Sequence, residues 1–78
     1  MRENVYETII EIISGILNVS PDMLEADTSI GDLETWDSLH HLRIIAKIEQ
    51  IYGFKFTPDV MIDLEDIEDI VKATEDRI

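Results

Sequence analysis

Apolar residues recur at the spacing of an α-helix in separate segments of this chain, and that spacing restricts the fold more than any other feature. Residues 3–17 show it first. Their apolar members fall on one helical face, mostly three or four positions apart: Val5, Ile9, Ile12, Ile13 and Ile16. These β-branched residues are mediocre helix formers, so the predicted helix would depend on packing for its stability.

The segment after this helix combines a capped turn with a long loop. Ser20-Pro21-Asp22 places a capping residue before a proline, which predicts a short helical turn that ends near residue 24. Residues 25–37 have no apolar period and several turn-forming residues, so they are predicted to form a loop. Three apolar side chains are expected to hold this loop against the core: Ile30, Leu33 and Trp36.

Helical spacing returns at residue 38 and continues to residue 52, where Gly53 is a plausible terminating residue. The expected buried face consists of Leu39, Leu42, Ile45, Ala46 and Tyr52. Ile44 and Ile51 fall at the edge of this face. Both a core position and an exposed apolar strip for docking are compatible with their spacing.

The last third of the chain predicts two more helices. Thr57-Pro58-Asp59 begins a short one by the same cap-and-proline logic, and Asp63 is expected to cap a final helix. The final helix has apolar or small residues at helical spacing: Ile67, Ile70, Val71, Thr74 and Ile78. We therefore predict an all-α four-helix bundle, with a long loop after the first helix and a short third helix, in a single domain over residues 1–78.

Composition limits what such a bundle can bind. The 78 residues include no cysteine and carry a net charge of −12, which excludes disulfides and argues against nucleic acid and anionic membranes. No apolar run approaches a membrane span, and the expectation is a cytoplasmic monomer. Residues 38–56 differ from the rest of the chain in their charge. They contain three basic residues, Arg43, Lys47 and Lys55, and one acidic residue, Glu49.

Ser38 stands at the point where the acidic loop becomes the second long helix. The first turn of a helix exposes backbone N–H groups and the positive end of the helix dipole, which suits a phosphate attached to a hydroxyl there. The same position also suits a simple helix cap, supplied by Ser38 or by Asp37. These residues alone leave both readings open.

Other site chemistries fit the sequence poorly. Ser38 has histidines at positions 40 and 41 and an aspartate beside it, but residues this close on one helix start cannot arrange a nucleophile, base and oxyanion donors around one carbonyl. An acidic stretch from Asp27 lacks the glycine and glutamate that a calcium loop needs at its sixth and twelfth positions. Two histidines without further ligands do not make a metal site. We expect neither an enzyme nor a metal protein.

The motif Asp37-Ser38-Leu39, at the start of the second long helix of a small acidic helical chain, resembles the acyl carrier protein family. The resemblance covers nearly the whole chain and includes the sequence segments 27–30 and 54–58. It implies that Ser38 is esterified by a 4′-phosphopantetheine arm, taken from coenzyme A by a phosphopantetheinyl transferase. The thiol of that arm would carry an acyl or aminoacyl group as a thioester between a loading enzyme and downstream enzymes.

The chain also departs from the common pattern of that family. Carriers of fatty acid synthesis usually have an acidic helix after the serine, and many have glycine where this chain has Thr35. The sequence Trp36-Asp37-Ser38-Leu39 is more similar to stand-alone or biosynthetic-cluster carriers, and this resemblance implies a specialised pathway. Aminoacyl or peptidyl cargo, and an unmodified interaction domain, are the alternatives. The residues expected to contact partners are Trp36, His40, His41, Arg43, Ile44 and Lys47.

Overall fold

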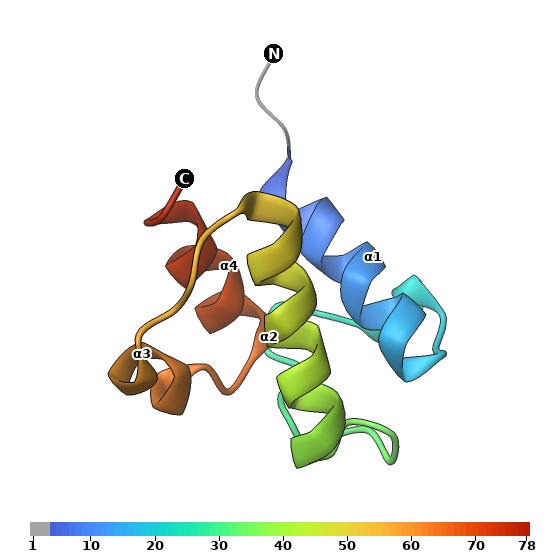
Figure 1. Cartoon of the computed structure of the whole chain (residues 1–78). Helices are drawn as coiled ribbons and strands as arrows, with labels where there is room; N and C mark the ends of the chain where they lie inside the picture. Colours follow the sequence, from blue (N-terminus) through green and yellow to red (C-terminus); the bar gives the residue numbers. More distant parts are fainter. Residues whose placement is uncertain (1–3) are drawn as a thin grey trace.

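The structure, a computed structural model, describes residues 4–78 as a set of packed helices (Figure 1). In chain order its elements are α1 (Val5–Leu17), the 3₁₀ turn η1 (Pro21–Met23), α2 (Ser38–Tyr52), α3 (Pro58–Asp63) and α4 (Ile67–Glu75). Helix α1 contacts both α2 and α4. The predicted all-α bundle, with its long first connection and its short third helix, is confirmed.

Helix α1 begins at Val5 because the Asn4 side chain caps it, accepting a hydrogen bond from the Glu7 amide at 3.2 Å. Residue 3, where the predicted helix began, lies outside the described residues. At the other end Asn18 adopts a left-handed conformation, with φ of 58°, and its amide bonds the Ser14 carbonyl. The buried face consists of Val5, Ile9, Ile12, Ile13 and Leu17, which confirms the predicted helical stripe in all but Ile16.

Helix α2 has the predicted bounds but buries only part of the predicted face, including Ile45. Its buried residues are Ile44, Ile45 and Ile48, whereas Leu39 is 65% exposed and Leu42 is 55% exposed. The prediction that the two leucines lie in the core is wrong. Apolar residues occur around much of α2, so the sequence offered two candidate stripes, and the isoleucine stripe is the one that faces the other helices.

In the last two helices, the structure corrects one prediction, the residue that caps α4. Helix α3 and the turn η1 form where the cap-and-proline patterns predicted them, although the Thr57 side chain makes no capping hydrogen bond. The cap of α4 is Asp66, whose carboxylate accepts from the Asp69 amide at 2.8 Å, and not Asp63, which is the last residue of α3. Residues 64–66 stay extended between the two helices because they pair with the long loop.

The long loop is held to the chain before α4 by backbone hydrogen bonds. The Ile30 amide donates to the Glu65 carbonyl at 3.0 Å, and the Ile67 amide donates to the Thr28 carbonyl at 3.1 Å. A single antiparallel bridge joins Ser29 to Asp66 in the same stretch. These bonds satisfy backbone groups of both segments, and they place residues 28–30 beside the start of α4.

Trp36 is the deepest anchor of this loop. Its side chain is 0% exposed, in one hydrophobic cluster with isoleucines from α1, α2 and α4. Ile30 and Leu33 are half-buried against the same cluster. The prediction that these three residues hold the loop to the core is confirmed, and the loop reaches α2 with its last buried residue two positions before Ser38.

Replacing Trp36 with alanine is expected to lower the free energy of unfolding by about 3–5 kcal/mol, because it leaves a large cavity in a small core. The matched control is Leu39→Ala, which removes an exposed side chain and should change stability by about 0.5 kcal/mol or less. Urea denaturation followed by circular dichroism measures both. Equal losses in the two variants would contradict the burial described here.

Candidate functional site

Ser38 is the first residue of α2, and its side chain is exposed. Figure 1 shows this end of α2 at the lower edge of the molecule, far from both chain ends. The first amides of a helix have no acceptor within the helix, so the N–H groups beside Ser38 face outward unless a side chain caps them. An anion on the Ser38 hydroxyl would lie close to these donors.

Asp37, and not Ser38, is the helix cap. Its carboxylate accepts a hydrogen bond from the His40 amide at 2.9 Å and lies 2.8 Å from Nδ1 of the same histidine. The amide hydrogen bond, followed by the contact with the His40 ring, lowers the pKa of Asp37 below its ordinary value. Asp37 therefore stays ionised at neutral pH and performs the capping that would otherwise occupy the serine.

The four serine hydroxyls of the chain are in different situations. Ser14 and Ser29 donate to the carbonyls of Glu11 and Asp27, and Ser20 accepts from the Asp22 amide in its capping role. The Ser38 hydroxyl has no hydrogen-bond partner among residues 4–78. A group that must be esterified needs an accessible and uncommitted oxygen, and Ser38 is the serine that offers one.

Trp36 and His41 form a second contact beneath the start of α2. The indole Nε1 donates to His41 Nδ1 at 3.0 Å, and the two rings stack with their centroids 5.9 Å apart. Because Nδ1 accepts this hydrogen bond, the proton of the neutral imidazole lies on Nε2. Burial lowers the pKa of His41, and the Leu64 carbonyl opposes that shift. The neutral ring fixes the loop to α2.

Two backbone hydrogen bonds close the loop just before this point. The Gly31 amide donates to the Trp36 carbonyl at 2.9 Å, and the Trp36 amide donates to the Leu33 carbonyl at 3.0 Å. Gly31 has a φ of 93°, a conformation that glycine adopts at little cost and other residues rarely adopt. The loop therefore enters Asp37 and Ser38 from a closed turn, and the position of the serine is defined on both sides.

The residues predicted to contact partners separate into three groups. Trp36 and Ile44 are 0% exposed, so their prediction as partner-binding residues is wrong; both are core residues. His40 and His41 are half-buried, and each ring is bound to a neighbouring side chain. Arg43 and Lys47 are exposed on α2.

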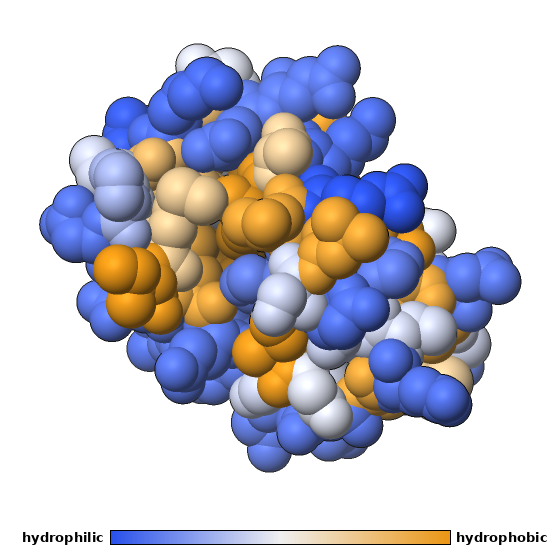
Figure 2. Space-filling view, turned by 60° about the horizontal axis from the view of Figure 1, so that its bottom comes forward, coloured by the Kyte–Doolittle hydropathy of each residue, from blue (hydrophilic) through white to orange (hydrophobic). Residues whose placement is uncertain are grey.

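An apolar surface next to Ser38 was not predicted from the sequence. Leu39 and Leu42 are exposed there, and α3 adds Val60 and Ile62, the latter 77% exposed. Figure 2 turns this end of the molecule forward and shows apolar areas among hydrophilic ones. Ile44, Ile45 and Ile48 form a second apolar stripe on α2, and spacing within the helix gives no signal that decides which stripe is buried.

Metal and membrane sites find no support in the described part of the chain. Across residues 4–78, no three His, Asp or Glu side chains gather closely enough to hold a metal ion. In the same residues no helix combines the length and the apolar content that crossing a bilayer requires.

Comparison with known proteins agrees with this geometry. Residues 7–74 match the family described as the phosphopantetheine attachment site, so the chain belongs to that family. It is also similar to the acyl carrier protein of Coprothermobacter proteolyticus, at 20% identity over 77 residues, which span 99% of this chain and 94% of that protein. The resemblance noted from the sequence is confirmed, and the prosthetic group is 4′-phosphopantetheine, held covalently.

The neutral state of His41 predicts a pH dependence of stability. Since its pKa in the folded protein lies below the ordinary value of 6.5, the unfolded chain binds a proton first as the pH falls. The stabilisation by His41 should therefore be complete above about pH 6.5 and decline as the pH falls from there toward the lowered folded value.

The comparison variant is His41→Gln, which cannot titrate in this range. The wild type should lose more stability than the variant between pH 7 and pH 5, as measured by chemical denaturation at each pH, with the fluorescence of Trp36 as the signal. An NMR titration of His41 with a midpoint at or above 6.5 would show that the ring is not held neutral as described.

Proposed function

We propose that Ser38 is the attachment point of the 4′-phosphopantetheine arm and that the chain carries acyl groups as thioesters on that arm. The observation that supports this most directly is the free, exposed hydroxyl of Ser38 at the start of α2, within the motif Asp37-Ser38-Leu39. The name of the relative from Coprothermobacter proteolyticus, an acyl carrier protein, supports acyl cargo. The arm supplies the reactive thiol that a chain without cysteine lacks.

The residues around Ser38 would position the arm rather than perform chemistry. Asp37 begins α2 so that the serine oxygen projects from a rigid element, and the outward-facing amides of the first turn would bind the phosphate of the arm. Carrier domains of this family are not catalytic. Consistent with that role, His40 contacts Asp37 and His41 contacts Trp36, so neither ring is placed as a base for Ser38.

Intact-mass measurement tests the attachment point. The wild-type protein, incubated with coenzyme A, Mg²⁺ and a broad-specificity phosphopantetheinyl transferase, should gain the mass of one phosphopantetheine, and Ser38→Ala should gain none. The matched control is Ser20→Ala, which removes another exposed serine at a helical N-terminus and should be modified normally. Several transferases that leave the wild type unmodified would instead indicate an unmodified interaction domain.

We further propose that partner enzymes approach the arm over an apolar and basic surface, in a specialised biosynthetic pathway. Leu39 and Leu42 supply the apolar part, and Arg43 supplies the positive charge. The first acid of α2 is Glu49, and its carboxylate accepts from the Phe56 amide at 2.8 Å. A partner surface with apolar and acidic residues would complement this face, in contrast to the basic surfaces expected for partners of acidic carriers.

Charge reversal tests the partner surface. Arg43→Glu is expected to reduce kcat/KM of the transferase that modifies the wild type by about tenfold at low salt, with a smaller effect at high salt, because exposed charges are screened. Arg43 is preferred over His40 because His40 also bonds the capping residue. The control is Lys55→Glu, with the same charge change beyond the end of α2. Equal rates for the two variants at both salt concentrations would contradict the proposal.

A further inference from the structure

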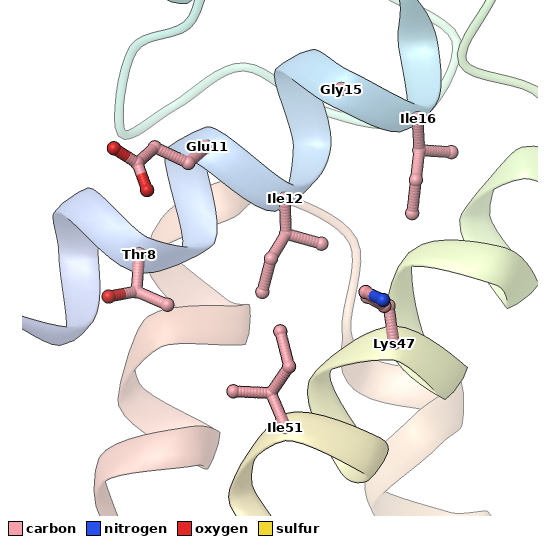
Figure 3. A pocket seen from close by; sticks show the side chains of 7 residues that line it. All are labelled: Thr8, Glu11, Ile12, Gly15, Ile16, Lys47 and Ile51. Atoms are coloured by element: carbon pink, nitrogen blue, oxygen red, sulfur yellow. The ribbon is translucent and has the colours of Figure 1, made fainter.

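An apolar groove lies between α1 and α2, on a different side of α2 from Ser38. Figure 3 shows Ile12 and Ile16 pointing from α1 toward α2, and Ile51 pointing back from α2. The groove has a volume of about 380 Å³ and continues along the same two helices past Ala46 to Arg43. Ile51 is 47% exposed, so the groove is an apolar surface without a covering element.

Gly15 keeps the middle of this groove open. It lies inside α1, where glycine is less favourable than alanine by about 0.5–1 kcal/mol. Nothing in the backbone requires glycine there, since its φ is not positive and an added Cβ would meet no atom within 4 Å. A residue that weakens the helix without a structural reason, beside an open apolar surface, indicates a functional constraint on that surface.

The charge at the edge of the groove is positive on the α2 side. Lys47 lies directly beside the apolar residues, and Arg43 lies at the end of the continuation. Glu11 is at the α1 edge, and in Figure 3 its carboxylate points away from Ile12 and Ile51. In a chain with a net charge of −12, this is an apolar surface bordered by cations, which favours an occupant with carboxylates beside apolar side chains.

The shape of the groove favours a helix as the occupant. The two helices run antiparallel, with Thr8 near Ile51 and Ile16 near Lys47 (Figure 3). From Arg43 to Ile51 the groove follows α2 for roughly 12 Å, about two helical turns. A small-molecule site would enclose its ligand, whereas an open groove between two helices accepts the side-chain ridge of a third.

We propose that this groove binds an amphipathic helix of a partner protein, with aliphatic side chains over Ile12, Gly15 and Ile51 and carboxylates near Lys47. Lys47 follows Ser38 by nine residues, about two and a half helical turns, so the two lie on opposite sides of α2. If Ser38 carries the arm, which rests on the function proposed above, a partner in the groove would hold the carrier while Ser38 stays accessible to enzymes.

Two synthetic peptides test the groove. Both have leucines at helical spacing, one with glutamates and the other with lysines on the flanking positions. In ¹⁵N NMR titrations of the wild-type protein, the glutamate peptide should shift the amides of Thr8, Ile12, Gly15, Ile16 and Lys47, and the lysine peptide should bind more weakly by about tenfold or more. No binding of the glutamate peptide, shifts centred on Leu39 and Leu42, or equal affinities of the two peptides would overturn the proposal.

Variants with matched controls separate filling of the groove from loss of the fold. Gly15→Leu should weaken binding of the glutamate peptide by about tenfold, and Gly15→Ala should weaken it by a smaller factor although it should unfold at a higher temperature. Lys47→Glu should weaken binding, whereas Lys55→Glu, with the same charge change outside the groove, should not. Unchanged binding by both Gly15→Leu and Lys47→Glu, or self-association of the chain through this face in light scattering, would contradict the proposal.

A final measurement connects the groove to Ser38. With the glutamate peptide at saturation, the transferase should still add one phosphopantetheine at the rate seen without peptide. A large loss of rate would show that the groove and Ser38 are not independent, and would overturn that part of the proposal. Absence of modification even without peptide would count against the function proposed for Ser38. Binding of the glutamate peptide would still test the proposal that the groove binds a helix.

Discussion

The burial of Trp36 is the constraint on which the rest of the site depends. A fully buried indole, hydrogen-bonded to His41, ends the long loop inside the core and fixes where the chain leaves it. The next residue, Asp37, is then placed to cap α2, and the residue after it, Ser38, is the first to project freely. Burial of Trp36 therefore positions the exposed side chain of Ser38, which contributes nothing to the core.

Because Asp37 caps α2, the serine beside it does not have to serve both as the helix cap and as the attachment point. A capping hydroxyl is committed to the backbone, as Ser20 is at the start of η1. With the aspartate in that role, the helix N-terminus keeps its outward-facing amides and the adjacent hydroxyl stays available. The arrangement suits covalent attachment of a phosphate-linked arm, and the chain belongs to the phosphopantetheine attachment family.

Local signals in the sequence predicted the elements well, but not which faces they bury. Capping and proline patterns located η1 and α3, and Gly53 located the end of α2. The buried stripe of α2 could not be chosen from periodicity, because apolar residues occur on two of its faces and only the placement of the other helices decides between them. Likewise, capping of α4 by Asp66 depends on a long-range pairing with Ser29.

We propose that this fold presents one serine, Ser38, for covalent attachment. Its most direct test is fragmentation mass spectrometry of the holo-protein, produced together with a phosphopantetheinyl transferase, which locates the arm on the chain. We expect a single arm, on the Ser38 side chain. An arm on Ser14, Ser20 or Ser29, whose hydroxyls are hydrogen-bonded here, would contradict it.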